Sequence, residues 1–343
     1  MSTTLRARAC GKLILSGEHA VVYGAPALVA AVARYSTVSF TPHAHGHLQT
    51  FLRGFSREPV SYPLAQLKRF RDRLDRHFDE FLNGTRPVHN ILGRPDDLLA
   101  YTLASLARRF LPLRGHIETQ SELPLGAGMG SSASVIAATL RLYEALCAQP
   151  LTPAERFAQI RFCERLQHGK GSAIDAAAVS FGGVQKVVDG QAEALPLDRL
   201  DGWYYYLDGI PAASTGECVA QVRCQFGADR LLWDEFAAVG QALEEVLRSG
   251  GDPRPALRAN QALLERLGVV PATTSARIQA LAASGATAKV SGAGSVRGPG
   301  GGMLLVYQPD PAAWQHWLAQ HPEPDAGPLA LAPGGVELLE SAP

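Results

Sequence analysis

The stretch Leu123-Pro-Leu-Gly-Ala-Gly-Met-Gly-Ser-Ser-Ala133 has alternating glycines at 126, 128 and 130, directly before two serines. Glycines let the backbone turn tightly and present successive N–H groups to one side. Residues 131–147 have helical apolar spacing, and a helix start would add free N–H groups and a positive dipole end. The loop therefore predicts an anion cradle, with phosphate as the usual occupant. A plain strand-to-helix turn with a serine cap is the alternative.

Outward from this loop, the chain alternates strand and helix patterns, which is typical of a mixed α+β fold. Strands are predicted at residues 6–16, 35–41, 116–121, 180–189, 202–208, 286–291 and 302–307. Helices are predicted at 63–83, 96–110, 131–147, 153–167 with Thr152 as N-cap, 228–250, 253–267 and 273–284.

Domain organisation is predicted from two changes in composition. Asp, Gly and Pro cluster near 187–202, which favours a boundary there and two domains, 1–190 and 191–343. Five prolines and few large apolar residues in 322–343 predict a loosely ordered tail.

The overall charge argues against a nucleic-acid partner. The 32 Lys+Arg residues balance 32 Asp+Glu, so no global field gathers a polyanion. The longest apolar run, Ala20 to Ala33, is short and broken by Gly24 and Pro26, so we expect no membrane span. Five scattered cysteines without a C-x-x-C pair, and no signal-peptide pattern, favour the cytoplasm.

Three further segments hold candidate site residues. Lys12 begins an apolar strand in a chain with only five lysines, and Glu18 and His19 follow in a turn. An edge-strand lysine with a solvated Glu-His pair would give the same pattern. Residues 288–302 form a second glycine-rich loop, which could also be a flexible hairpin.

The third segment runs from Glu164 to Asp175. Glu164 and His168 are four residues apart and share a helix face, and Gly169 and Gly171 end that helix. Asp175 lies among alanines, where burying a carboxylate is costly without a specific role. The alternative is that Asp175 is only a helix N-cap, and the pattern favours neither.

These four segments, in this order, resemble the GHMP kinase family, named for galactokinase, homoserine, mevalonate and phosphomevalonate kinases. Residues 11–24 resemble the first mevalonate kinase motif, 124–133 the ATP loop, and 168–175 with 181–183 the family's His-Gly-x-x-Ser-x-x-Asp segment. Residues 260–263 and 267–269 resemble the mevalonate kinase helix before the third motif. The resemblance spans residues 6 to 307.

The resemblance implies an ATP- and Mg²⁺-dependent kinase of a small-molecule alcohol, with mevalonate as the first candidate. It implies an N-terminal domain like ribosomal protein S5 domain 2, with a left-handed βαβ crossover. It implies a C-terminal ferredoxin-like sandwich, with the active site in the cleft between the two. Another acceptor alcohol, such as phosphomevalonate, and a non-catalytic ligand sensor are the alternatives. A homodimer is left open.

The resemblance also carries residue roles. It makes Asp175 the catalytic base, Lys12 its partner, and Ser132 and Glu164 the Mg²⁺ ligands, with Ser131 as a second choice. It assigns nucleotide binding to Pro124, Gly126, Gly128, Gly130, Ser131, Ser132 and Ala133. It assigns substrate binding to Glu18, His19, Ser172, Thr215, Gly292 and Ala293.

The chain departs from the family pattern in three places. Ser295-Val-Arg297-Gly-Pro299 interrupts the third glycine-rich motif, so that Arg297 could reach a phosphate or the substrate. Residues 210–216 contain no Arg or Lys where the family has a basic residue, and Lys170-Gly171 replaces a small residue or proline. These departures bear on the identity of the acceptor more than on the reaction.

Overall fold

The computed structural model describes residues 4–54, 56–106, 114–322 and 325–339. Two long strands, β1 (Leu5–Ser16) and β2 (Ala27–Pro42), form the centre of an eight-stranded sheet. Its order is β12-β1-β2-β5-β3-β4, and β6 pairs with β2 and β7. The other strands are β3 (Leu48–Leu52), β4 (Val60–Tyr62), β5 (Gly115–Ser121), β6 (Val184–Val188), β7 (Gln191–Leu195) and β12 (Val336–Leu339).

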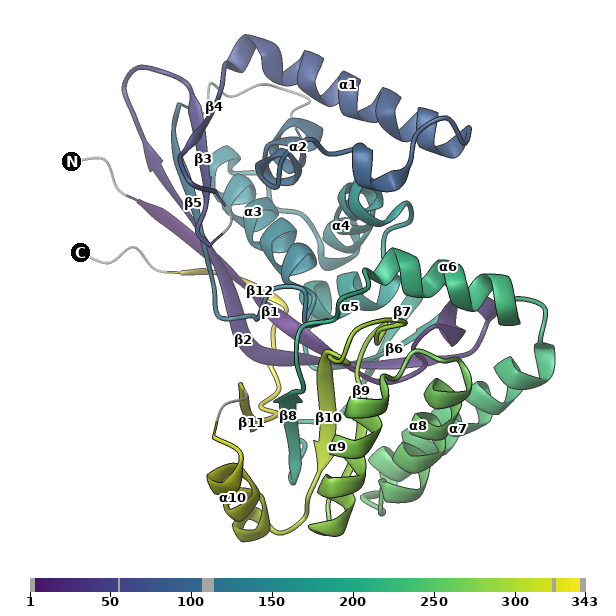
Figure 1. Ribbon diagram of the computed structural model, residues 1–343. Helices are drawn as coiled ribbons and strands as arrows, with labels where there is room; N and C mark the ends of the chain where they lie inside the picture. The colour runs from purple at the N-terminus through teal and green to yellow at the C-terminus, as the bar shows by residue number, and fades with distance from the viewer. Residues whose placement is uncertain (1–3, 55, 107–113, 323–324, 340–343) are drawn as a thin grey trace.

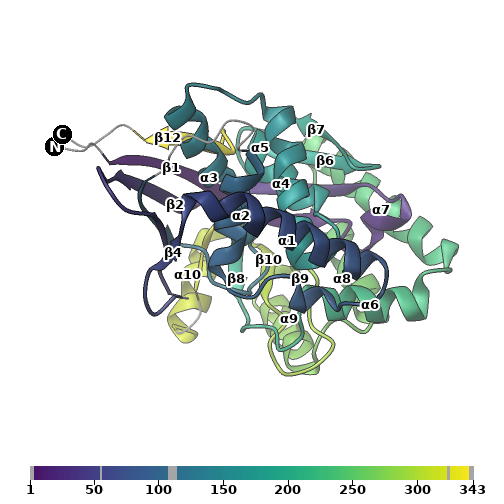
Figure 2. The ribbon, with the colours of Figure 1, turned by 90° about the horizontal axis from the view of Figure 1, so that it is seen from above.

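Five helices cover one face of this sheet (Figure 1): α1 (Leu64–Leu82), α2 (Asp96–Leu106), α3 (Ser131–Cys147), α4 (Pro153–His168) and α5 (Ala173–Phe181). Seen from above, α1 and α2 lie over α3 and α4 (Figure 2). Buried alanines on α3 and α5, such as Ala137 and Ala177, let these helices pack closely against β1 and β2. This close packing brings the start of α3 and the start of α5 to the same strand, β1.

A second, four-stranded sheet has the order β11-β8-β10-β9 and is antiparallel throughout. Its strands are β11 (Ala326–Pro328), β8 (Trp203–Leu207), β10 (Met303–Tyr307) and β9 (Thr287–Val290). The helices of this half are α6 (Thr215–Phe226), α7 (Arg230–Ser249), α8 (Arg254–Arg266), α9 (Ala272–Ala283) and α10 (Pro311–Gln320). Figure 1 shows α7, α8 and α9 on the opposite side of β1 and β2 from α1–α4.

One hydrophobic core joins the two sheets. Leu13 and Leu15 of β1 point away from α3 and pack with Trp203, Met303 and Leu305 of the smaller sheet. Because side chains alternate along a strand, β1 contributes to cores on both of its faces. The C-terminal half also has its own core, which contains Trp233, Phe236 and Trp314. None of the described helices combines the length and apolar character needed to cross a bilayer.

The predicted elements differ from the structure in detail. The predicted strand 35–41 begins earlier, at Ala27, while Ala20–Tyr23 forms a 3-10 turn (η1). The predicted strand 180–189 begins only at Val184, because α5 continues through its apolar residues to Phe181. The predicted helix 96–110 is observed to Leu106, and its last residues lie outside the described part of the chain.

The C-terminal tail differs most from its expectation of loose order. In residues 325–339, β11 pairs with β8 and β12 pairs with β1, and Leu329 and Ala332 are buried. Both are edge strands, and proline is tolerated at a sheet edge, so composition misled the prediction. Because the tail contributes a strand to each sheet, the division into 1–190 and 191–343 remains a prediction.

Candidate active site

The first glycine-rich loop is anchored on β1 and opens directly into α3. Lys12 N donates a 3.0 Å hydrogen bond to Met129 O. Gly126, Gly128 and Gly130 all have positive φ, and a Cβ at Gly130 would lie 2.9 Å from Lys12 Cγ, so a side chain there would collide. The N-cap of α3 is Gly130 and makes no side-chain cap bond. The serine-capped alternative is therefore wrong, and no capping side chain covers the first amides of α3.

Lys12 and Asp175 form an ion pair beside this loop. Lys12 Nζ lies 3.0 Å from Asp175 Oδ1, and their side chains are 5% and 19% exposed. Ser172 is the N-cap of α5 and accepts a 3.1 Å hydrogen bond from Asp175 N. The N-cap alternative for Asp175 is therefore wrong, and its carboxylate is free to face Lys12. The Ser172 hydroxyl, predicted to bind substrate, serves as the cap.

Ser132, in the first turn of α3, meets Glu164 of α4. Ser132 Oγ donates a 3.0 Å hydrogen bond to Glu164 Oε1, which favours Ser132 over Ser131 as the partner of this carboxylate. Glu164 is fully buried on α4, and its Oε2 has no hydrogen-bond partner among the described residues. Burial, together with the smaller effect of the nearby Asp175 charge, raises the pKa of Glu164 to about 8.

This pair fits a magnesium ion. Mg²⁺ prefers oxygen ligands and takes one or two from the protein, with substrate phosphates and water completing its shell. Ser132 and Glu164 supply hard oxygens, and the unsatisfied Oε2 is the orphaned acceptor that a cation would satisfy. No group of three or more His, Cys, Asp or Glu that could hold a metal occurs in the described ranges.

A second lysine–carboxylate pair lies where the second glycine-rich loop meets β1. Lys289 of β9 donates to Glu18, and both side chains are buried, at 0% and 1% exposure. Ser291 Oγ accepts a 2.8 Å hydrogen bond from Ile14 N and donates one of 3.1 Å to Ile14 O. These contacts join the smaller sheet to the end of β1. No role for Lys289 was predicted from sequence, and the only signal was that lysines are scarce.

His19 lies in the same junction. It has φ +60, which is uncommon for a non-glycine residue, and its Nε2 is 3.1 Å from Ala293 O. Burial lowers the pKa of His19 to about 4, against a weaker opposing effect of the Ala293 carbonyl. The predicted substrate residues His19 and Ala293 therefore contact each other.

A cavity of about 440 Å³ lies between the two glycine-rich loops. Gly126 to Gly128 line one side, and Pro211 to Thr215 with Glu217 line another. The remaining wall comes from the second loop: Ser291, Ala293, Gly294, Arg297, Gly301 and Gly302. Thr215 and Ala293 thus border the cavity as predicted. Gly292 packs against the first loop, since its Cβ would lie 3.8 Å from Gly128 Cα.

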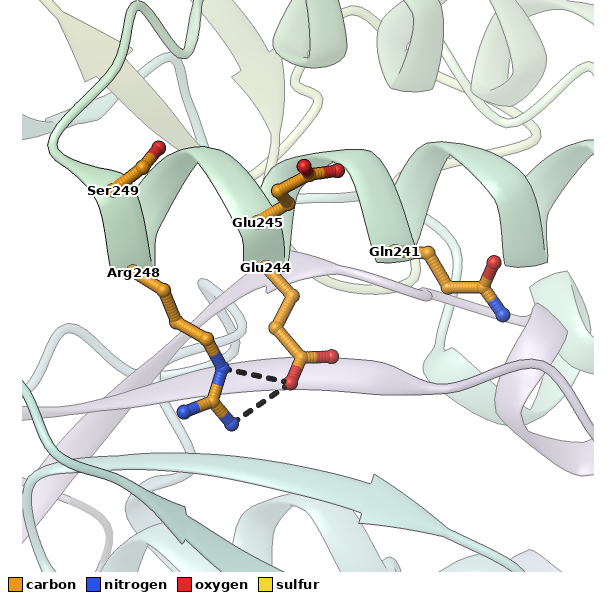
Figure 3. A pocket seen from close by; sticks show the side chains of 5 residues that line it. All are labelled: Gln241, Glu244, Glu245, Arg248 and Ser249. Carbon is orange, nitrogen blue, oxygen red and sulfur yellow. Dashed lines mark hydrogen bonds and ion pairs between the residues drawn. The ribbon is translucent and has the colours of Figure 1, made fainter.

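Another cavity, of about 390 Å³, lies against α7 and is lined by Gln241, Glu244, Glu245, Arg248 and Ser249 (Figure 3). Two of its charged side chains are already paired, since Glu244 binds Arg248 at 2.9 Å, and Glu244 also binds Lys186 at 2.8 Å. None of the predicted site residues lines it. The cavity between the glycine-rich loops is therefore the candidate ligand site, and the residue roles within it remain predictions.

Comparison with known proteins agrees with this geometry. Residues 97–183, which include the first glycine-rich loop, Glu164 and Asp175, match the family model "GHMP kinases N terminal domain". Mevalonate kinase of Thermococcus sibiricus is 27% identical over 316 residues, 89% of each chain. Mevalonate kinase of Methanothermobacter thermautotrophicus is 29% identical over 310 residues, 88% of this chain and 90% of that protein.

Solved structures share the fold. Methanococcus jannaschii mevalonate kinase superposes with a TM-score of 0.77 at 18% identity, covering 95% of this chain and 97% of that one. L. major mevalonate kinase, solved with R-mevalonate, gives 0.64 at 22% identity, with coverage of 91% and 89%. Streptococcus pneumoniae phosphomevalonate kinase gives 0.65 at 15%, with coverage of 97% and 99%. Residues 97–183 match a GHMP kinase domain, and together with the relatives this match shows that the chain is a small-molecule kinase.

Proposed function

We propose that this kinase transfers the terminal phosphoryl group of ATP to the 5-hydroxyl of mevalonate in isoprenoid precursor synthesis, with Mg²⁺ as cofactor. The observation that carries the proposal is the Lys12–Asp175 pair at 3.0 Å beside a glycine loop that opens into uncapped helix amides. The extent of the match to proteins named mevalonate kinase supports this acceptor. We place the reaction in the cytoplasm, where ATP and a water-soluble acceptor are available.

Asp175 and Lys12 would act on the acceptor hydroxyl. Phosphoryl transfer needs an oxygen held in line with the phosphate and relieved of its proton. The Asp175 carboxylate, 19% exposed, would accept or orient the hydroxyl proton. The Lys12 ammonium would offset the negative charge of the carboxylate and of the alkoxide as it forms.

The glycine loop and the start of α3 would hold the nucleotide phosphates. Backbone N–H groups at a helix N-terminus bind anions without a formal positive charge, which agrees with a chain of zero net charge. Ser132 and Glu164 would hold Mg²⁺, which when bound neutralises phosphate charge. The buried junction around Glu18 and Lys289 would keep the second loop in contact with β1 and exclude water from this side.

The fold alone does not distinguish acceptors, because phosphomevalonate kinase has the same fold. A non-catalytic sensor is disfavoured, since Lys12, Glu164 and Asp175 are all present, with Lys12 paired to Asp175 and Glu164 bonded to Ser132.

A panel of acceptors tests the proposal. Purified protein is given ATP, Mg²⁺ and one alcohol at a time: mevalonate, phosphomevalonate, homoserine or galactose. ADP release is measured, and the product is identified by mass. We expect the highest kcat/KM with mevalonate, and Asp175→Asn protein serves as the inactive control. A higher kcat/KM with another alcohol would contradict the proposed acceptor, and no turnover with any alcohol would contradict the kinase activity.

A further inference from the structure

The five residues that interrupt the second glycine-rich loop, Ser295 to Pro299, are fixed against the segment that precedes α6. Ser295 Oγ accepts a 3.2 Å hydrogen bond from Ala213 N and donates one of 2.6 Å to Arg297 O. Gly298 has φ +73, and a Cβ there would lie 2.6 Å from Ala212 Cβ, so a side chain at this position would collide with Ala212. The loop backbone is therefore held in place beneath the Arg297 side chain.

A second contact holds the other end of this insertion. Pro299 O accepts hydrogen bonds from the hydroxyls of Thr273 and Thr274 at the start of α9. Ser295 is only 2% exposed, whereas the Arg297 side chain is 57% exposed. An anchored backbone that carries one exposed, charged side chain is a preorganised ligand contact.

Arg297 supplies the only positive charge among the described residues that line the 440 Å³ cavity. The segment across from it, residues 210–216, contains neither Arg nor Lys. The rest of the wall is glycine backbone, small side chains, the hydroxyls of Ser214, Thr215 and Ser291, and the Glu217 carboxylate that pairs with Arg297. A cavity of this composition suits a small polar ligand with one anionic end.

The Arg297 side chain pairs with Glu217. Its Nη2 lies 3.1 Å from Glu217 Oε1, and both side chains are about half exposed. Exposed pairs of this kind are weak, so a ligand carboxylate can replace Glu217 at little cost. Glu217 keeps another role in either state, because its Oε2 accepts a 2.7 Å hydrogen bond from Ser214 N in the capping box of α6.

We propose that Arg297 binds the carboxylate of the acceptor, in place of its pair with Glu217, and so selects an acceptor with an anionic end. The planar guanidinium can donate two parallel hydrogen bonds to a carboxylate. This inference rests on the proposed function. We place the acceptor on the Arg297 side of the cavity, because Arg297 shares this wall with Thr215 and Ala293, to which the family resemblance assigns substrate binding. Gly126 and Gly128, which would hold the nucleotide phosphates, line another side of the same cavity, so the test must also measure KM for ATP.

Two matched variants test this role. Arg297→Gln removes the cation. Glu217→Gln removes the competing charge but keeps the capping box, because glutamine serves at N3 of a helix as glutamate does. KM and kcat are measured for mevalonate, for its neutral primary amide and for ATP. Thermal unfolding verifies that both variants fold.

If Arg297 binds the acceptor carboxylate, Arg297→Gln raises KM for mevalonate roughly tenfold, as expected for loss of one charge-assisted contact. It leaves kcat, KM for ATP and KM for the amide close to the wild-type values. Glu217→Gln leaves KM for mevalonate unchanged or lowers it. Opposite or unequal effects of the two variants on KM for mevalonate would indicate that Arg297 binds the acceptor. If the Arg297–Glu217 pair were only structural, removing either partner would change KM equally.

Three results would overturn the inference: a parallel rise of KM in both variants, an equal rise for mevalonate and its amide, or a rise confined to ATP. Calorimetric binding of mevalonate to wild-type and Arg297→Gln protein separates this failure from failure of the proposed function. Wild-type protein that does not phosphorylate mevalonate contradicts the function. Equal mevalonate affinity in the two proteins contradicts only the role of Arg297.

Discussion

The two lysine–carboxylate pairs at β1 have the same chemistry and opposite surroundings. Lys12–Asp175 borders the first glycine loop, and its carboxylate is 19% exposed. Lys289–Glu18 is closed off, with both side chains at 1% exposure or less. A carboxylate that a ligand can reach is able to act on that ligand, whereas a sealed pair can only hold the parts around it. We therefore propose catalysis for the Lys12–Asp175 pair and a positioning role for the Lys289–Glu18 pair.

Removing Lys12 should have the largest effect on rate. Lys12→Met leaves Asp175 without its counter-charge and the forming alkoxide without a cation. We expect kcat to fall on the order of 10²–10³-fold. Steady-state kinetics and thermal unfolding are measured together, since a loss of kcat in an unfolded protein would carry no information. A folded variant that retains kcat would contradict the catalytic role proposed for the Lys12–Asp175 pair.

Removing Lys289 should act on stability instead. Lys289→Met leaves Glu18 buried and unpaired, which costs about 3–5 kcal/mol of unfolding free energy. The matched double variant Glu18→Gln with Lys289→Met leaves no charge behind and should recover much of this loss. Urea unfolding measures both. If the single variant is as stable as the wild type, the Lys289–Glu18 pair does not hold the second loop against β1.

The next prediction tests Glu164 as a ligand of Mg²⁺. Glu164→Gln keeps the shape of the side chain and removes the ligand charge, so nucleotide binding should need roughly tenfold more Mg²⁺. Ser132→Ala should have a smaller effect, because it removes a neutral ligand. Mg²⁺ titrations of nucleotide binding, followed by fluorescence, measure this without turnover. Unchanged Mg²⁺ dependence in Glu164→Gln would refute its assignment as a ligand.

The smallest expected effect is on the pH dependence of the unfolding free energy, through His19, the residue after Glu18. The pKa of His19 is about 4 in the folded protein and near 6.5 when unperturbed. Between these values the unfolded chain binds a proton that the folded protein does not. The unfolding free energy therefore falls as pH drops from about 6.5 to about 4. One such group contributes a slope of up to about 1.4 kcal/mol per pH unit.

His19→Asn should make this pH slope shallower, and asparagine tolerates the positive φ at this position. Part of the slope remains in the variant, because burial also lowers the pKa of His168. Urea unfolding of both proteins between pH 4.5 and 7 measures the difference. Identical slopes would show that His19 is not held neutral by burial.

Local sequence signals predicted α3, α4 and the first glycine-rich loop well. Thr152 and Glu155 form a capping box, and α4 begins at Pro153 as expected from those residues. The glycine loop and α3 also lie where their sequence placed them, since glycine conformations and helix starts depend on near neighbours. The N-cap alternative for Asp175 failed only because Ser172, three residues earlier, is the better acceptor.

The Lys289–Glu18 pair joins residues that are far apart in the chain, so local sequence patterns did not predict it. Lys289 and Glu18 are 271 residues apart, and no periodicity connects them. The prediction of a loosely ordered tail was wrong for the same reason, because β12 is stabilised by pairing with β1 and not by its own composition. The insertion at 295–299 was visible as a departure, but its contact with Ala212 and Ala213 was not.

The most direct test of the central claim is Asp175→Asn, which is nearly the same size as aspartate and leaves the backbone donor to Ser172 in place. Turnover of mevalonate and equilibrium binding of ATP are measured on the same protein. We predict that phosphorylation falls on the order of 10²–10⁴-fold or below detection, while ATP affinity stays close to the wild-type value. Turnover comparable to the wild type would contradict the account.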